Sequence, residues 1–291
     1  MNVEIDTKNI GDNHVVIPAR AGDGGRIGIY ARGGCHLRAL FACAPLIEPV
    51  LRGTCCIYHD GQVSDARTDQ QLQILEGFPR QWLEPVIEKF RLGPDYFTAR
   101  LFEKDFAVPG RDDLGRFPKT AIIYSVASDA VGRKLYRHRQ HGFLFDPGAG
   151  WLRGVDHFLN DPAAVAWFRQ QFEPIGMMSV EAFVENFTRL VRSLRARTGA
   201  HVVAMNVLSL EPGNTTHNYQ SVKHSDTMRW RQFNIALAEL SRQLDFPVLD
   251  QDRVVRRAGM RGQMAAAHFP PAVNLLIARE AFRILKDGGI F

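Results

Sequence analysis

The chain has 291 residues, of which 45% are hydrophobic and 23% charged, and its formal net charge is +5 at pH 7. This length suits one large α/β domain or two small ones, and the apolar content excludes a disordered protein. No run of about 18 apolar residues is present, so a transmembrane helix is not expected.

The first 25 residues resemble a polar lead-in with one edge strand at residues 14–18, and they lack the layout of a secretory signal peptide. Four cysteines, Cys35, Cys43, Cys55 and Cys56, are too few and too clustered for a disulfide framework, and none shows CxxC zinc spacing. We therefore expect a cytoplasmic protein with reduced thiols, no metal site and no membrane partner.

After residue 25, short strand-like runs alternate with longer helical stretches. The expected strands are residues 26–31, 54–59, 96–102, 120–127, 201–208 and 246–249, and the expected helices are residues 36–51, 69–90, 180–198, 226–244 and 272–285. This alternation predicts a mainly parallel, five-stranded sheet covered by helices on both faces. The predicted fold is one three-layer α/β/α domain over residues 26–291, with an inserted lid region at about residues 104–175.

The inserted region carries a concentration of positive charge at Arg133, Lys134, Arg137 and Arg139. These residues either bind a phosphate, the phosphates of coenzyme A or an acidic carrier protein, or form a solvated helix face. No recognisable RNA- or DNA-binding motif accompanies them, so a nucleic-acid partner is not expected.

Cys35 follows a strand-like run and two glycines, and it precedes a predicted helix. Glycines allow a sharp turn that presents a side chain at the carboxyl end of a strand, and the helix N-terminus lowers the pKa of a thiol there. A buried structural cysteine is the alternative, because free cysteines are common in cores. The neighbouring His36 either polarises the site or faces solvent or core.

Two further segments point to the same crevice. Gly61 follows the second strand, where its backbone N–H can stabilise an oxyanion, and His268 lies just before the C-terminal helix. Ligands of doubly wound sheets bind at the carboxyl ends of the strands. A cysteine and a histidine that meet there form a nucleophile–base pair.

In their order, these segments resemble the SGNH, or GDSL-like, hydrolase superfamily over about residues 26–286. The triplet at residues 33–35, Gly-Gly-Cys, stands where the family has Gly-Asp-Ser. Gly61 matches the family's oxyanion-hole glycine, and His268 matches its catalytic histidine. The resemblance implies a flavodoxin-like sheet and hydrolase or acyl-transfer chemistry.

The chain departs from the family pattern at three places. Cysteine replaces the nucleophilic serine, and Ala265 stands where the family has the aspartate of Asp-x-x-His. In the third block, Lys104-Asp105 replaces Asn-Asp in an ungapped match, and Ser128-Asp129 is the alternative match. A thiol tolerates a missing carboxylate better than a hydroxyl does, because it ionises far more readily.

The sequence therefore predicts acyl transfer through a thioester on Cys35, with His268 as general base and then general acid. The backbone N–H groups of Cys35 and Gly61, aided by Lys104, are expected to bind the oxyanion. His36, Asp129 and Asp250 are supporting candidates, although Asp250 serves equally well as a cap. The acyl group passes either to water, as in an esterase or thioesterase, or to a hydroxyl or amine acceptor.

The glycine-cysteine turn is also similar to a capsular-polysaccharide-biosynthesis branch of the superfamily that is associated with coenzyme A. This resemblance implies no tightly bound cofactor, a coenzyme A or phosphopantetheine thioester as co-substrate, and a small-molecule or carrier-bound acyl substrate. One alternative is a catalytically degenerate domain that binds a ligand or an acyl carrier protein. A redox-active thiol protein is a third reading, although no second cysteine stands beside Cys35.

Overall fold

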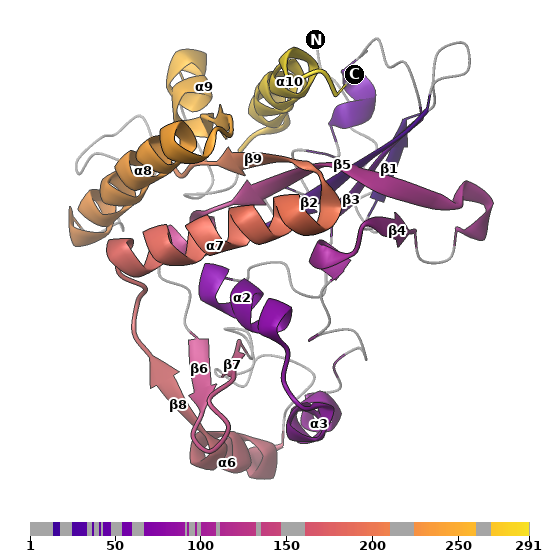
Figure 1. The fold of residues 1–291 in the computed structure, drawn as a ribbon. Coiled ribbons are helices and arrows are strands. Elements are labelled where there is room, and N and C mark those ends of the chain that lie inside the picture. Colours follow the sequence, from indigo (N-terminus) through magenta and orange to yellow (C-terminus); the bar gives the residue numbers. More distant parts are fainter. Residues whose placement is uncertain are drawn as a thin grey trace.

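The structure is a computed structural model, and it describes residues 14–17, 25–33, 37, 41, 43–47, 54–59, 67–90, 92, 97, 100–108, 111–131, 135–146, 161–209, 224–259 and 269–290. Within these ranges, five parallel strands form the main sheet in the order β3-β2-β5-β9-β10 (Figure 1). Their bounds are Arg26–Arg32 for β2, Thr54–His59 for β3, Arg116–Ser125 for β5, His201–Met205 for β9 and Val248–Leu249 for β10.

This strand order is the flavodoxin-like order 2-1-3-4-5 when the five strands are numbered along the chain. Two antiparallel strands extend the sheet. β1 (His14–Ile17) pairs with β3, and β4 (Asp105–Ala107) pairs with the first residues of β5. The predicted α/β class with a mainly parallel five-stranded sheet is confirmed.

Helices cover both faces of the main sheet (Figure 1). On one face, α2 (Thr68–Glu76) contacts α7 (Val180–Thr198), which in turn contacts α8 (His224–Leu244). On the other face lies α10 (Pro271–Asp287), which packs against α9 (Gln251–Ala258) and the short 3-10 helix Ala44–Leu46. None of the helices in the described ranges is both long enough and apolar enough to cross a membrane.

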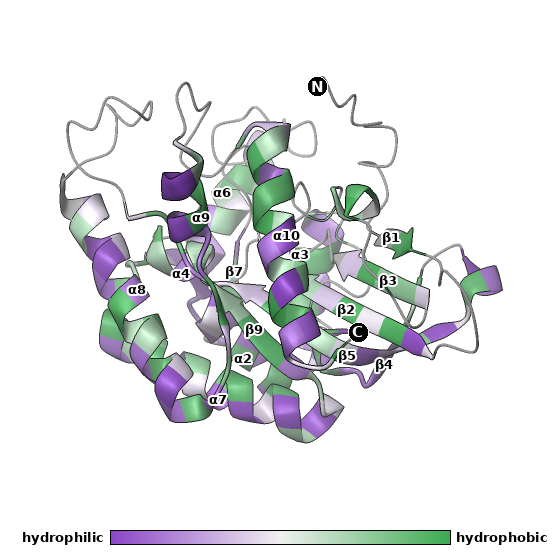
Figure 2. Ribbon diagram, turned by 90° about the horizontal axis from the view of Figure 1, so that it is seen from above, coloured by the Kyte–Doolittle hydropathy of each residue, from purple (hydrophilic) through white to green (hydrophobic). Residues whose placement is uncertain are grey.

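The core follows the periodicity of the sequence. In Figure 2 the central strands are mainly hydrophobic, whereas the covering helices alternate hydrophilic and hydrophobic residues. α7 has the bounds predicted for residues 180–198, and the face that it buries is formed by Phe183, Phe187, Leu190, Val191 and Leu194. An apolar stripe at helical spacing packs in this way because it removes the most nonpolar area from water.

A smaller unit lies beside α2. It consists of the antiparallel sheet β7-β6-β8, the helices α3 (Arg80–Lys89) and α6 (Pro162–Gln171), and a separate cluster of mainly aromatic side chains. The strands are Leu135–His138 for β6, Leu144–Phe145 for β7 and Phe172–Ile175 for β8. The range 104–175, expected as a lid insertion, therefore contains the small sheet and also β5, a central strand of the main sheet.

Two predicted elements are wrong. Residues 96–102 do not supply the third parallel strand, which is β5, and Arg100–Phe102 forms a 3-10 helix instead. Residues 69–90 are two helices rather than one, because Gly77 ends α2 with φ at 75° and Pro79 precedes α3. Most of the helix expected at residues 36–51 lies outside the described residues.

β2 and β5 approach each other closely at Gly28. A Cβ atom at this position would lie 2.2 Å from the Pro118 carbonyl oxygen and 3.0 Å from a ring carbon of Phe106. We expect Gly28→Ala to lower the free energy of unfolding by about 1–3 kcal/mol, because either β5 or β2 must shift. Urea denaturation measures the change.

Gly25→Ala is the matched control, because nothing lies within 4 Å of a Cβ atom at that position. Its effect is expected to stay within about 0.5 kcal/mol. Equal unfolding midpoints for the two variants would show that the strands are not held this closely at Gly28.

Candidate functional site

The candidate site lies where parallel strands β2 and β5 end. After β2 the chain forms β3 on one side, and it then returns to form β5 on the other side, so the ends of β2 and β5 are the topological switch point of the sheet. β2 ends at Arg32, three residues before Cys35. Cys35 itself lies outside the described residues, as do His36, Gly61, His268, Arg133 and Lys134, and their roles stay predictions.

Lys104 lies away from this edge. Its carbonyl oxygen accepts a hydrogen bond from the backbone N–H of Lys119 at 2.9 Å, and Lys119 pairs with Gly28 in the first half of β2. Cys35, by contrast, follows the last residue of β2. The assignment of Lys104 to the oxyanion site depended on a strand at residues 96–102, which the structure does not contain. The strand that leads to the switch point is β5, and Ser128-Asp129 follow it.

Asp250 takes the capping role. Its Oδ1 accepts from the backbone N–H of Arg253 at 3.1 Å at the start of α9, and from Asn206 Nδ2 at 2.8 Å. Arg137 and Arg139 are exposed on the small sheet, where Arg139 forms an ion pair of 3.1 Å with Glu173. Exposed ion pairs of this kind contribute little to stability.

A buried polar cluster occupies the switch point. Arg32 is 3% exposed, and its Nε donates to Gln71 Oε1 of α2 at 3.1 Å. Asp129 is fully buried at the start of the short helix α4 (Ala127–Ala130), and its Oδ1 accepts from the backbone N–H of Thr68 at 2.8 Å and from Thr68 Oγ1 at 2.9 Å. α2 therefore connects the ends of β2 and β5 through its first turn.

Two further guanidinium groups hold this cluster in place. Arg67, which is also buried, forms a bidentate ion pair with Asp69 at 3.2 and 2.6 Å and donates to the carbonyl of Gly176. Arg229 of α8 donates to the backbone carbonyls of Asp129 and Ala130 at 2.8 and 2.9 Å. The backbone that carries Asp129 is thereby fixed from two elements.

Sequence reasoning missed Arg32 and Gln71. The available signal was an arginine at the end of an otherwise apolar strand, three residues before a candidate nucleophile. Within the described part of the chain, Arg32 Nη1 and Gln71 Nε2 are buried without hydrogen-bond partners, and such groups in a native structure require an explanation.

Burial raises the pKa values of one carboxyl group at the switch point and of three core thiols. It raises the pKa of Asp129 to about 7, although the two hydrogen bonds from Thr68 act in the opposite direction. It also raises the pKa of the Cys56 thiol to about 12, and it raises the pKa values of the Cys43 and Cys55 thiols. These three cysteines are core residues, as expected, and are protonated at neutral pH.

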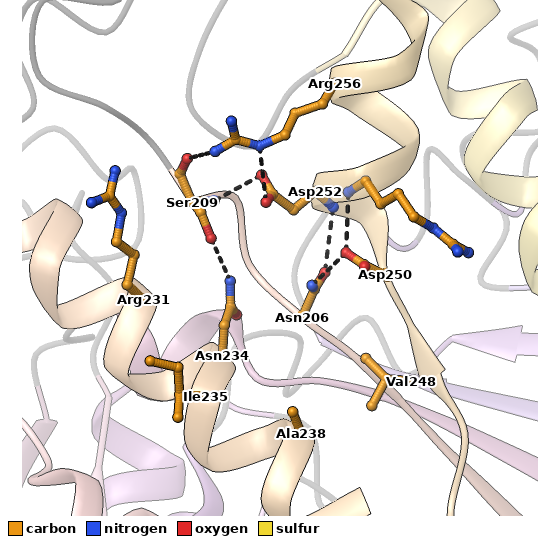
Figure 3. Close-up of a pocket in the computed structure, with 11 residues that line it drawn as sticks. Asn206, Ser209, Arg231, Asn234, Ile235, Ala238, Val248, Asp250, Asp252 and Arg256 are labelled. Atoms are coloured by element: carbon orange, nitrogen blue, oxygen red, sulfur yellow. Dashed lines mark hydrogen bonds and ion pairs between the residues drawn. The ribbon is translucent and has the colours of Figure 1, made fainter.

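A second feature of this edge is a polar pocket of about 640 Å³ beside α8 and α9 (Figure 3). Its polar side chains bind one another. Asp252 accepts from the backbone N–H of Ser209 at 2.9 Å and from Arg256 Nε at 3.1 Å, and Asn234 Nδ2 donates to Ser209 Oγ at 3.0 Å. This network joins the ends of β9 and β10 to the two helices.

Comparisons with known proteins find similar solved structures, all at low sequence identity. No protein-family model matches the chain, and no curated protein matches its sequence. Among solved structures, it is similar to a member of the lipolytic G-D-S-L family from Veillonella parvula, with 11% identity, 89% of this chain and 98% of that chain covered, and a TM-score of 0.44. It is also similar to an acetylxylan esterase from Geobacillus stearothermophilus, with 10% identity, 91% and 95% covered, and a TM-score of 0.44. Likeness at this level does not identify an activity.

The raised pKa of Asp129 predicts a pH dependence of stability. Because the carboxyl titrates near 7 when folded and near 3.8 when unfolded, the native state binds the extra proton between these values. The contribution of Asp129 to the free energy of unfolding is therefore fully present below about pH 4. It decreases as the pH rises to about 7, by up to about 1.4 kcal/mol per pH unit. Asp129→Asn is expected to remove this contribution, as measured by urea denaturation from pH 4.5 to 7.5.

Asp113→Asn serves as the control. Hydrogen bonds from Arg111 lower the pKa of the exposed Asp113 carboxyl, so this group is ionised throughout the range from pH 4.5 to 7.5. It is expected to keep the wild-type slope. An Asp129→Asn protein with the same slope as wild type would show that Asp129 is ionised throughout the range.

Proposed function

We propose that the protein is an acyl-transfer enzyme with Cys35 as its nucleophile and His268 as its general base. The observation that carries this proposal is the strand order, because it makes the end of β2 the switch point of a doubly wound sheet. The chain reaches Cys35 three residues after that point. Buried polar and charged side chains lie beside the same strand end, as is common near active sites.

The proposed reaction has two stages. The Cys35 thiol gives its proton to His268, and the sulfur attacks the carbonyl carbon of the acyl donor to form a C–S bond. Backbone N–H groups of Cys35 and Gly61 stabilise the oxyanion. The bond to the leaving oxygen or sulfur then breaks, and the leaving atom takes the proton from His268. In the second stage an acceptor attacks the thioester, His268 takes the acceptor's proton, and Cys35 is released.

The remaining cysteines support the choice of Cys35. Cys43, Cys55 and Cys56 are at most 1% exposed, and burial keeps each thiol protonated at neutral pH. A protonated thiol without access to solvent is a poor nucleophile. A cysteine nucleophile in this chain is therefore best assigned to Cys35.

We further propose a coenzyme A or phosphopantetheine thioester as acyl donor. The support is the basic sequence around the small sheet, where Arg137 and Arg139 are exposed to solvent. Arginine side chains bind phosphate groups well because their N–H donors are arranged in a fork.

Reaction with p-nitrophenyl acetate tests the nucleophile. At pH 7.5 we expect an acetyl group on Cys35 of the folded protein and no modification of Cys43, Cys55 or Cys56, as measured by digestion and mass spectrometry. In urea an alkylating reagent should modify all four thiols. His268→Ala is expected to slow acetylation of Cys35 by about 100-fold or more, the usual contribution of a general base.

Cys43→Ala is the matched control, and it is expected to keep the wild-type acetylation of Cys35. Acetylation of Cys43 in the folded protein would contradict the proposal. A folded protein that is not acetylated at any cysteine would also contradict it, and would favour the degenerate domain that binds a ligand or carrier protein.

A further inference from the structure

The outer side of α7 carries a shallow groove whose charges are separated by sign. α7 contacts both α8 and α2 on one face of the main sheet (Figure 1). On the side of the helix away from its buried stripe, the groove is lined by the exposed charged residues Glu181, Glu185, Arg189 and Arg192. Among the described residues, only those of α7 line this groove, so this side of the helix is open to a partner.

The groove contains a row of side chains whose charge changes sign along the helix. Residues 181, 185, 188 and 192 are four, three and four positions apart, so they lie in line along one side of α7. Glu181 and Glu185 begin this row and Arg192 ends it, with Arg189 directly beside its basic half. Thr188 lies near the middle. A row of this kind is complementary to a reversed copy of itself.

The stability of a single helix does not explain this arrangement. Glu181 and Glu185 are neighbours on the helix surface, and like charges at this spacing destabilise an isolated helix. Arg189 and Arg192 are a second pair of neighbouring like charges. The helix dipole favours acidic residues in the first turn and basic residues in the last turn, but Glu185, Arg189 and Arg192 lie in neither turn. Within the described part of the chain, Glu185 and Arg192 form no ion pair, whereas Arg189 pairs with Glu76 of α2.

We propose that this row of α7 binds the same row of a second copy of the chain, in an antiparallel contact with two-fold symmetry. In this contact Glu181 faces the partner's Arg192, and Glu185 faces the partner's Arg189. Both pairings occur in one register, and the two-fold axis, which passes beside Thr188, repeats each of them. The separated charges of one helix are thereby neutralised by those of the other.

Other partners match the row less well. Parallel packing of two copies would place like charges opposite each other, which is unfavourable. A uniformly acidic or uniformly basic partner would match only one half of the row. The net charge of +5 makes two copies repel each other at long range, so their association depends on a local pattern of opposite charges such as this one.

The residues between the charges suit close packing of two helices. Packed helices lie about 8–10 Å apart, depending on the side chains at the contact, and a threonine near the axis keeps this distance short. The Thr188 hydroxyl donates to the carbonyl of Val184 at 2.7 Å, so the contact can bury it without leaving an unpaired donor. Val180 and Val184 are half-buried in the groove and add nonpolar area at its margin.

The contact is small, and it leaves the candidate active site open. One pair of helices buries less than the standard interface area of about 1,600 Å², so we expect a dissociation constant in the micromolar range. α7 covers a face of the sheet rather than the carboxyl end of β2 (Figure 1). The inference therefore does not depend on the proposed acyl transfer.

Sedimentation velocity of the full-length protein tests for the dimer. At concentrations from about 1 to 200 µM we expect a shift from monomer to dimer. Added salt should weaken this dimer, because it screens exposed ion pairs, whereas a dimer limited by repulsion between two positively charged copies would become stronger. A monomer at every concentration, or a dimer that salt strengthens, would overturn the inference.

Charge reversal tests the register of the contact. Arg192→Glu places carboxylates opposite each other, and we expect it to raise the dissociation constant by about tenfold or more. Glu181→Arg should have the same effect by opposing two cations. Glu181→Arg combined with Arg192→Glu in one chain should restore the dimer, because each copy then carries the same pair with reversed signs. A combined variant as weak as the two single variants would overturn the inference.

Mixing the two single variants gives a second measurement, which does not require the combined variant to fold. At the wild-type dissociation constant, the Glu181→Arg protein and the Arg192→Glu protein should each be mainly monomeric. An equimolar mixture should form a heterodimer, because every reversed charge then faces an opposite charge. A mixture that stays monomeric would overturn the inference.

Arg80→Glu is the matched control. Arg80 is an exposed arginine of α3 that pairs with Glu84 on the same helix, and its reversal changes the net charge by as much as Arg192→Glu does. This variant is expected to dimerise as the wild-type protein does. An Arg80→Glu protein as monomeric as Arg192→Glu would show that net charge rather than the row on α7 governs association, and would overturn the inference.

Discussion

The pairing of β2 with both β3 and β5 is the constraint on which the rest of the structure depends. It buries every residue of β2 after Arg26. It also places β3 and β5 on opposite sides of β2, so the connections that follow β2 and β3 run in opposite directions across the sheet. The strand consequently ends at a switch point with Arg32 inside the protein. A buried guanidinium is costly to desolvate, so the position of Gln71, and with it the first turn of α2, is tied to the end of this strand.

α2 also links that strand end to the small sheet. Gln73 donates to the carbonyl of Leu144 in β7 at 2.6 Å and accepts from its backbone N–H at 2.5 Å, in the manner of a neighbouring strand. Gln71, two residues earlier on the same helix, holds Arg32. A displacement of the small sheet would therefore act on the polar cluster through α2, because Leu144 of β7 is bound to this helix.

The sequence predicted most of the fold because alternating strands and helices leave a strong hydrophobic pattern. The bounds of α7 and β3 could be read from it directly. The strand predicted at residues 96–102 is wrong because Leu101 and Phe102 are buried in a 3-10 helix. A short apolar run in the sequence does not distinguish such a helix from a strand. The misplacement of Lys104 followed from that error. Arg32 was missed for a different reason, since an arginine at the end of a strand is usually exposed and only the sheet order shows that this one is not.

The two ends of the sheet differ in how they satisfy a buried cation. At the end where the parallel strands begin, Lys119 binds two carbonyls and lies over the rings of Tyr30 and Phe106, 4.8 and 5.3 Å from their centroids. This fold can therefore satisfy a buried charge with its own groups. Where the strands end, Arg32 and Asp129 retain unpartnered atoms within the described structure. Proteins break such local rules mainly where function requires it, so the different environments of these two buried charges support our proposal that the active site lies at the carboxyl end of β2.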